Sequence, residues 1–110
     1  MKVKTFKSGA KREDKSHKPR PDLISPYFEE RLGFVLSKGA EVHGARNWEK
    51  GLPDDSALSS LIRHLMAYKM SKSKGYTKLS NNPEDDHLGQ AAFNLMVLIH
   101  NEEINKLKQI

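Results

Sequence analysis

The chain has no cysteine among its 110 residues, so disulfide bonds and thiolate-bound zinc sites are excluded. It also lacks an apolar run of about 20 residues, the length that a helix needs to span a bilayer. Its basic N-terminus is not followed by the apolar segment of a secretory signal peptide. These absences predict a cytoplasmic protein that has no membrane partner.

Several sequence motifs of catalytic chemistry are missing as well. The chain has no phosphate-cradling glycine motif, no serine nucleophile elbow and no HExxH zinc pair. Within the expected helices, no two acidic residues are spaced i, i+3 or i, i+4, the spacings that place two carboxylates on one helical face. A magnesium site would therefore have to be assembled from different segments.

No segment alternates apolar and polar residues as a half-buried strand does, and no repeat is present. The sequence predicts an all-α fold, a small bundle of three main helices over residues 25–44, 54–70 and 83–106. Ser25 and Asn82 suit the N-cap, and Pro26 and Pro83 the first helical position. Apolar residues at helical spacing are expected to form the core faces of the second and third helices: Leu58, Leu61, Ile62 and Leu65, then Leu88, Ala91, Ala92, Leu95, Leu98 and Ile99.

The net charge of +5 is concentrated at the N-terminus. Residues 1–20 carry eight Lys and Arg against two acidic residues, whereas residues 21–110 carry eleven against twelve. Pro19 and Pro21 favour extended backbone in the residues before them. Residues 1–24 are therefore expected to form an extended basic arm, and residues 25–110 the helical domain. The arm either attracts phosphates of nucleic acid or nucleotides, or is a solvated tail.

Polar residues lie beside the apolar stripes of two helices. On the third helix they are His87, Gln90, Asn94 and Asn101, which either line a cavity or bond to neighbouring helices or an oligomer partner. On the second helix, Arg63 and His64 point about 100° apart and flank the stripe. The planar fork of Arg63 suits a phosphate, and the alternative is a surface arginine beside a half-buried histidine.

The only tryptophan lies in HGARNWEKG, between the first two helices, among charged residues and glycines. Trp48 could stack on a purine, since aromatic faces accept bases, or it could plug the end of the bundle. Arg46 could meet a phosphate while Asn47 reads a base edge, or both could bond to backbone. The sequence leaves these alternatives open.

Four stretches, taken in order, resemble a phage protein family. They are KPRPDLISP, SKGAEVHGARNW, LIRHLMAY and EDDHLGQAAFNLMVLIH, and the resemblance covers about residues 12–103. The family is the N-terminal domain of the phage dATP/dGTP diphosphohydrolases, which look like distant relatives of the all-α MazG-like pyrophosphohydrolases. The resemblance implies that residues 25–110 are a helical nucleotide-binding domain. It further implies that Mg²⁺ and water cleave a deoxypurine nucleoside triphosphate to monophosphate and pyrophosphate.

Carried over by matching positions, the resemblance implies these site residues: Asp22, Gly39, Gly44, Arg46, Asn47, Trp48, Arg63, His64, Asp86, His87 and Asn94. Metal oxygens are then expected from Asp22, Glu41 and Asp86. Substrate contacts are expected from Arg46, Asn47, Trp48, Arg63 and Asn94. His64 and His87 are the expected catalytic residues, which orient water or a phosphate.

The sequence departs from the family pattern at two places. The family often has a second histidine three residues after the first on the third helix, and Gln90 occupies that position here. A paired-histidine metal site is therefore not expected. The E-x-x-E and E-x-x-D helix motifs of MazG-like enzymes are absent too.

Three functions follow as hypotheses. The first is a Mg²⁺-dependent deoxynucleoside triphosphate pyrophosphohydrolase. The second is a binding protein that sequesters a nucleotide, or a nucleotide signal of host defence, without cleaving it. The third is a nucleic-acid-binding module that uses residues 1–20 and whose affinity falls steeply with salt. In each case a homo-oligomer is expected, because so short a chain buries a limited share of its surface, and a phage-encoded protein would act in the host cytoplasm.

Overall fold

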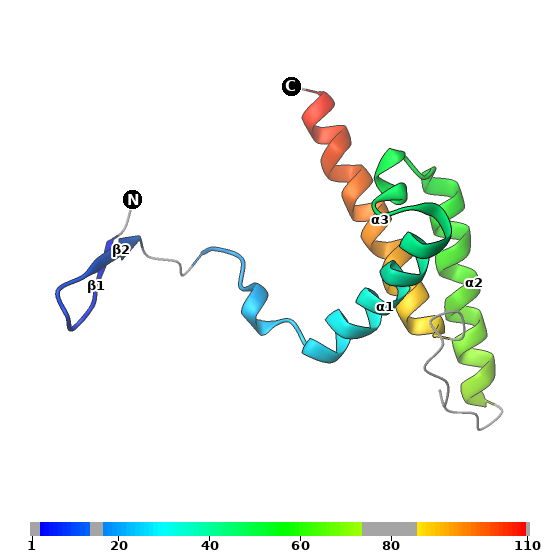
Figure 1. Cartoon of the computed structure of the whole chain (residues 1–110), viewed down its shortest axis with the longest axis horizontal. Helices are drawn as coiled ribbons and strands as arrows, with labels where there is room; N and C mark the ends of the chain where they lie inside the picture. The colour runs from blue at the N-terminus through cyan, green and yellow to red at the C-terminus, as the bar shows by residue number, and fades with distance from the viewer. Residues whose placement is uncertain (1–2, 14–16, 74–85, 110) are drawn as a thin grey trace.

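The computed structural model describes residues 3–13, 17–73 and 86–109. Three α-helices dominate this part of the chain (Figure 1), which confirms the predicted all-α fold. The elements in chain order are the strands β1 (Val3–Thr5) and β2 (Lys11–Glu13), the 3₁₀ helix η1 (Pro21–Leu23), α1 (Pro26–His43), the 3₁₀ helix η2 (Asn47–Lys50), α2 (Asp54–Ser73) and α3 (His87–Lys108).

The first helix begins and ends where the sequence predicts. The Ser25 hydroxyl accepts a hydrogen bond from the Phe28 N–H at 3.4 Å, and Pro26 occupies the first position. At the other end, the Gly44 N–H donates to the Ala40 carbonyl at 3.0 Å. Gly44 has a φ of 93°, which glycine adopts without a steric penalty, so the chain turns out of α1 at this residue.

The start of the third helix differs from the prediction. Asn82 and Pro83, the expected cap and first residue, lie outside the described residues. The helix itself begins at His87, and Asp86 is the N-cap, because its carboxylate accepts a hydrogen bond from the Gly89 N–H at 3.0 Å. A cap at Asp86 gives a helix of 22 residues that runs to Lys108.

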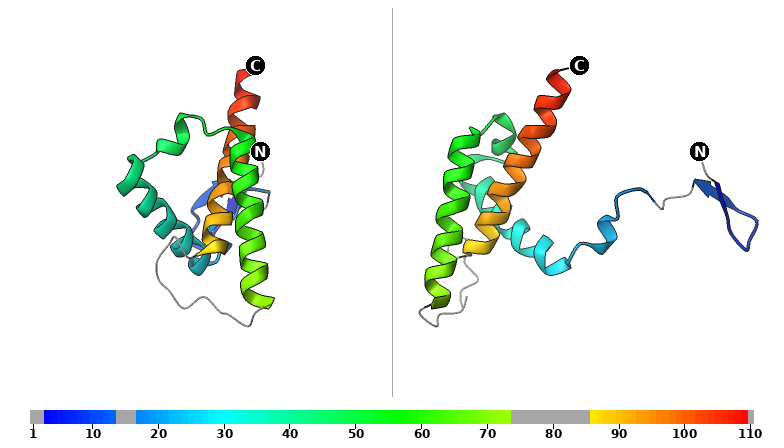
Figure 2. Two further views of the ribbon diagram at one scale, coloured as in Figure 1. Left: turned by 90° about the vertical axis from the view of Figure 1, so that its right-hand side faces the viewer. Right: turned by 180° about the vertical axis from the view of Figure 1, so that it is seen from behind.

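α3 is the central element of the bundle. α2 lies antiparallel along one side of it, and α1 packs against another side (Figures 1 and 2). The buried apolar residues in the described part are small: Val35, Ala57, Ala91 and Val97. Such side chains bury little apolar area, so this core is modest for a chain of this size.

The predicted core face of α2 is wrong at three of its four residues, whereas that of α3 is right in part, since Ala91 is buried. Leu58, Ile62 and Leu65 of α2 are exposed, as are Leu95 and Ile99 of α3. The residues buried between the helices are smaller or polar, and they include Ala57, Asn94 and Val97. The structure of the single chain therefore leaves its large aliphatic stripes in solvent.

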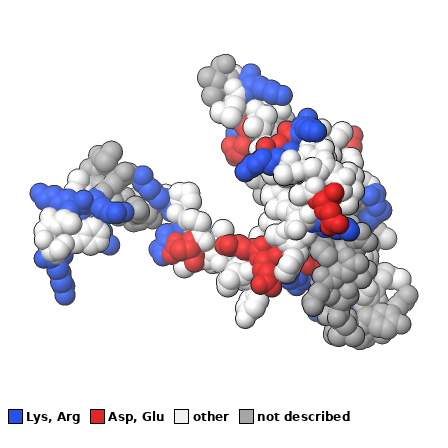
Figure 3. Space-filling view, in the orientation of Figure 1, with Lys and Arg blue, Asp and Glu red and all other residues white. Residues whose placement is uncertain are grey.

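The N-terminal arm extends away from the helices, as predicted, but it contains two short strands that the sequence did not predict (Figure 1). β1 and β2 pair antiparallel, with Val3 opposite Glu13, and Gly9 (φ 88°) lies in the turn between them. Three-residue strands are too short to show alternation. The arm contributes to a radius of gyration of 18.6 Å, against about 13 Å for a compact domain of this length. Its tip is rich in Lys and Arg (Figure 3).

Among the described residues, no helix has both the length and the apolar character that crossing a membrane would require.

Candidate functional site

A groove of about 750 Å³ lies between the C-terminal half of α1, the turn that follows it, and α3. We call it the loop groove. The described residues that line it are Val35, Leu36, Lys38, Gly39, Ala40, Val42, His43, Gly44, Ala45, Arg46, Asn47, Trp48, Leu52, Gln90 and Phe93. Its volume is in the range of pockets that hold small molecules, about 300–1,000 Å³.

The turn that forms one wall of this groove has an unusual backbone. Arg46 has a φ of 60°, the only positive φ of a non-glycine residue in the described part of the chain. Glycines with positive φ, Gly44 and Gly51, flank it on either side. A left-handed residue that is not glycine costs free energy, and such residues cluster at ligand-binding sites. The backbone strain thus marks the turn, independently of its composition.

Arg46 directs its guanidinium into solvent at the rim of the groove. Its side chain is 76% exposed, and its Nη1 forms an ion pair with Glu49, three residues later in η2. An exposed pair of this kind contributes about 0–1 kcal/mol, so Arg46 can exchange Glu49 for another anion at low cost.

Trp48 is half-buried and packs edge-on against His100 of α3, with ring centroids 4.8 Å apart and planes at 81°. This contact anchors η2 to the bundle. Trp48 also lines the groove, so both alternatives left open by the sequence have a structural counterpart.

The charged groups that line the loop groove are basic. Lys38, His43 and Arg46 contribute to its wall, and none of the described residues that line it is acidic. Its deeper wall is apolar, with Val35 and Phe93 among the lining residues. A site that joins a basic rim to an apolar wall suits a ligand with an anionic part and a flat, apolar part.

The three predicted metal ligands lie in separate places. Asp22 accepts two hydrogen bonds from Arg20 in the arm, at 2.9 and 2.7 Å. Glu41 is exposed on α1, 3.9 Å from the Lys38 ammonium. Asp86 is buried at the start of α3 and is held by Arg31. The described residues contain no group of three or more histidines or acids placed to hold one metal ion.

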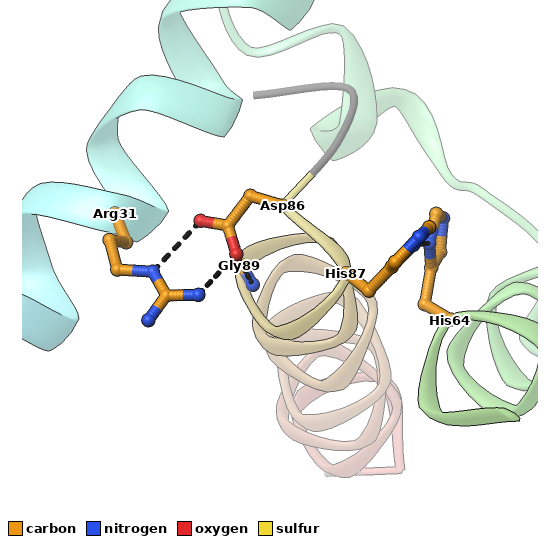
Figure 4. A network of polar contacts seen from close by, with 5 residues as sticks. All are labelled: Arg31, His64, Asp86, His87 and Gly89. Carbon is orange, nitrogen blue, oxygen red and sulfur yellow. Dashed lines mark hydrogen bonds and ion pairs between the residues drawn. The ribbon is translucent and has the colours of Figure 1, made fainter. Parts of the chain in front are cut away.

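Arg31 is a site residue that sequence reasoning missed. Its Nε donates to Asp86 Oδ2 at 2.9 Å and its Nη2 donates to Oδ1, so the guanidinium grips the carboxylate with two bonds (Figure 4). These bonds raise the pKa of Arg31 above its ordinary value. The pair joins α1 to the first turn of α3 across 55 residues of sequence, and no local pattern could have indicated it.

Gly89 completes this contact because it lets the helices approach closely. A Cβ atom at this position would lie 2.5 Å from Asp86 Oδ2 and 3.3 Å from Val35 Cγ2. Both distances are shorter than ordinary carbon contacts, so any larger residue would displace the capping carboxylate or α1.

The two predicted catalytic histidines meet on the other side of α3. His87 points from the start of α3 toward His64 in the middle of α2, whereas Asp86 points the opposite way (Figure 4). Their Nδ1 atoms are 3.1 Å apart, and the ring centroids are 5.4 Å apart. Partial burial lowers the pKa of His64, and electrostatic interactions with His87 and Arg63 lower it further. Neither histidine lines the loop groove.

The remaining predicted substrate contacts bond within the bundle. Arg63 donates to Ser59 one turn earlier on α2, at 2.6 Å. The Asn94 amide donates to the Ser60 hydroxyl at 3.2 Å and to the Gln90 carbonyl at 2.9 Å. Asn101 donates to the Leu52 carbonyl and to Asp54 at 2.9 and 2.8 Å. Asn94 and Asn101 therefore contact neighbouring segments, whereas Gln90 of the same polar edge lines the loop groove, so each of the two sequence interpretations describes part of this edge.

Comparison with known protein families matches most of the chain. A family model described as "dATP/dGTP diphosphohydrolase, N-terminal" matches residues 8–109. Comparison with curated proteins returns no match. Comparison with solved structures returns none either.

Proposed function

Because the chain belongs to the dATP/dGTP diphosphohydrolase N-terminal family, we propose that it binds a purine deoxynucleoside triphosphate in the loop groove and hydrolyses it to monophosphate and pyrophosphate. One observation carries this proposal. The groove gathers five of the positions that the resemblance implies, namely Gly39, Gly44, Arg46, Asn47 and Trp48.

The groove offers a distinct group for each part of such a ligand. Arg46 and Lys38 on the rim are cations for the phosphates, and a guanidinium can bind two phosphate oxygens at once. The indole of Trp48 and the apolar wall near Phe93 offer a surface for the base, and the stacking of a base on an aromatic ring is worth about 1–3 kcal/mol.

Mg²⁺ is the cofactor expected for this reaction, and oxygen ligands would have to hold it. Within the described residues, the candidates Asp22, Glu41 and Asp86 do not fit this role together. Two of them lie apart on exposed elements, and the carboxylate of Asp86 is already bound by Arg31 and the Gly89 N–H. We therefore assign binding and orientation of the nucleotide to the groove and derive no metal-dependent step.

The separation of these carboxylates favours a second candidate function, the capture of a nucleotide without cleavage. A site with a basic rim and an apolar wall, where the described residues bring no carboxylates together, suits the binding of a triphosphate more directly than its cleavage. Incubation with dATP or dGTP and Mg²⁺ separates the two functions. Release of pyrophosphate supports hydrolysis, and recovery of the intact bound nucleotide supports sequestration.

The groove is tested by replacing Arg46 with glycine, which tolerates the left-handed backbone at this position. Loss of the guanidinium is expected to weaken deoxynucleotide binding about 10- to 100-fold, because a hydrogen bond to a charged group contributes about 1.5–3 kcal/mol. Isothermal titration calorimetry measures this affinity. Added nucleotide should also quench the fluorescence of Trp48, the only tryptophan.

The matched control is Lys106→Ala, because Lys106 is also an exposed cation paired with a glutamate three residues away. It lies near the end of α3, outside the groove, and its loss should leave the affinity unchanged. Equal affinities of wild type and Arg46→Gly would place the nucleotide elsewhere on the chain.

We also propose that the chain works as a homo-oligomer, through a second, apolar groove of about 560 Å³. Exposed side chains from all three helices line it, including Tyr27, Phe28, Leu65 and Leu95. Since the described core has only four buried apolar residues, the partner must be present whenever the chain folds, which points to a second copy.

Light scattering after gel filtration is expected to give the mass of an oligomer for the wild type and a lower mass for Leu65→Glu. A buried charge at this position would oppose association. Leu107→Glu is the control, because Leu107 is equally apolar but lies near the C-terminus, outside the apolar groove. A monomeric wild type would contradict the proposal.

A further inference from the structure

The contact between His64 and His87 needs a cation or a proton between its two nitrogens. The two Nδ1 atoms face each other at 3.1 Å. If both imidazoles are neutral and carry their protons on Nε2, two lone pairs point at one another, which is repulsive. The repulsion is removed either by a proton on one Nδ1, which makes a single hydrogen bond, or by a metal ion bound to both nitrogens.

We propose that His64 and His87 form a two-histidine site for a divalent transition-metal ion that joins the middle of α2 to the start of α3. This proposal departs from the sequence-based expectation of no paired-histidine metal site: Gln90 removes a pair along α3, whereas His64 and His87 meet across two helices. The site is separate from the loop groove, which neither histidine lines.

The spacing of the two nitrogens suits one ion. Nitrogens about 2.0–2.1 Å from a metal ion lie about 2.9 Å apart at a right angle and about 3.4 Å apart at the tetrahedral angle. The observed 3.1 Å falls between these limits. In the tetrahedral arrangement the ring centroids would be about 5.2 Å apart, given the same bond lengths, against 5.4 Å here. In the structure the two centroids lie nearly in line with the two nitrogens, so each ring would have to turn by about 35° to direct its lone pair at a tetrahedral ion.

The surroundings of the two side chains also favour metal binding. Both histidines are half-buried, so an ion can reach them from solvent while the helices limit their movement. The pKa of His64 is lowered, which keeps its imidazole neutral near pH 7, the form that binds metal. Because each ring sits on a different helix, the ion would act as a cross-link and leave further coordination positions for water or another ligand.

The ligand chemistry selects the class of metal. Imidazole nitrogen suits Zn²⁺, Co²⁺, Ni²⁺ and Cu²⁺, whereas Mg²⁺ prefers oxygen ligands and gives up its water reluctantly. Affinity should rise in the order Co²⁺, Ni²⁺, Cu²⁺, with Zn²⁺ below Cu²⁺. Mg²⁺ should not compete for the site.

The test is metal titration of the full chain, purified without a histidine tag and without nucleotide, by calorimetry and thermal unfolding. Ni²⁺ or Zn²⁺ should bind once per histidine pair and raise the unfolding temperature. Loss of a residue that only hydrogen-bonds to a metal ligand lowers metal affinity about 10–100-fold. His64→Ala and His87→Ala each remove a direct ligand, so each should lower the affinity by roughly 100-fold or more.

His17→Ala is the matched control, because His17 is exposed in the N-terminal arm, away from the pair and outside the loop groove. It should bind Ni²⁺ with the wild-type affinity. Far-ultraviolet circular dichroism checks that the His64 and His87 variants are folded. The proposal is overturned if the folded variants keep wild-type affinity, or if the wild type does not bind. Because nucleotide is absent throughout, failure here leaves the proposed function standing, and the converse also holds.

Discussion

Replacement of Arg31 by alanine is expected to lower the free energy of unfolding by about 3 kcal/mol, since it removes two charge-assisted hydrogen bonds from a buried carboxylate. That carboxylate belongs to Asp86, whose side chain is 5% exposed and also accepts a hydrogen bond from the Gly89 N–H. The variant would loosen α1 from α3 at the point where the two helices meet. Urea denaturation at fixed protein concentration measures the change.

The chain contains a matched control for this variant. Arg20 grips Asp22 with the same two-bond geometry, but both side chains are about 60% exposed. Solvent screens such an exposed pair, so Arg20→Ala should change the stability little. Arg31→Lys keeps the charge but loses the planar fork, and we expect an intermediate loss. Equal stabilities of Arg31→Ala and Arg20→Ala would show that burial gives the Arg31 pair no special weight.

Replacement of Asn94 by aspartate is expected to destabilise the fold by a similar amount, about 3 kcal/mol, although the side chain keeps its shape. Asn94 is 6% exposed, and its amide nitrogen donates to the Gln90 carbonyl and the Ser60 hydroxyl. A carboxylate cannot donate to that carbonyl, so the change would set two oxygens against each other and bury a charge. The deficit should shrink on acidification, as the acid takes up a proton and becomes neutral.

Asn105→Asp makes the same chemical change at an exposed position of α3. It should leave the free energy of unfolding within about 0.5 kcal/mol of the wild type, as is usual for surface substitutions. If Asn94→Asp were as stable as this control, the amide would not be a structural contact, and its predicted role in substrate binding would regain support.

Local signals were enough to predict the helices but not their faces. Ser25, Pro26 and Gly44 set both ends of α1, because caps and a positive φ act within a few residues. The apolar stripe of α2 was assigned to the core because periodicity shows which residues share a face, not what that face meets. In the structure this stripe is exposed at Leu58, Ile62 and Leu65, and small residues such as Ala57 face α3 instead.

The sequence likewise predicted only the part of the candidate site whose residues are close together in the chain. Gly44, Arg46, Asn47 and Trp48 are consecutive or nearly so, and the sequence predicted that they act together as a shaped turn. Arg31 and Asp86 come together only through the packing of α1 on α3. They are 55 residues apart in the sequence, and spacing rules describe only residues within a few positions of each other. Equally, the wide separation of the predicted metal ligands could not be read from residue types, which say nothing about distance in space.

The amides of α3 also fix how far α3 can slide along α2. Asn94 meets Ser60, and Asn101, two turns later, meets Asp54 at the beginning of α2. A shift of α3 by one helical turn, about 5.4 Å, would break both contacts and part His87 from His64 as well. Small apolar side chains such as alanine would tolerate that slip, whereas the polar contacts admit one alignment. The helix pair therefore has a single register. Hydrogen bonds determine it, because the small apolar side chains alone would allow several.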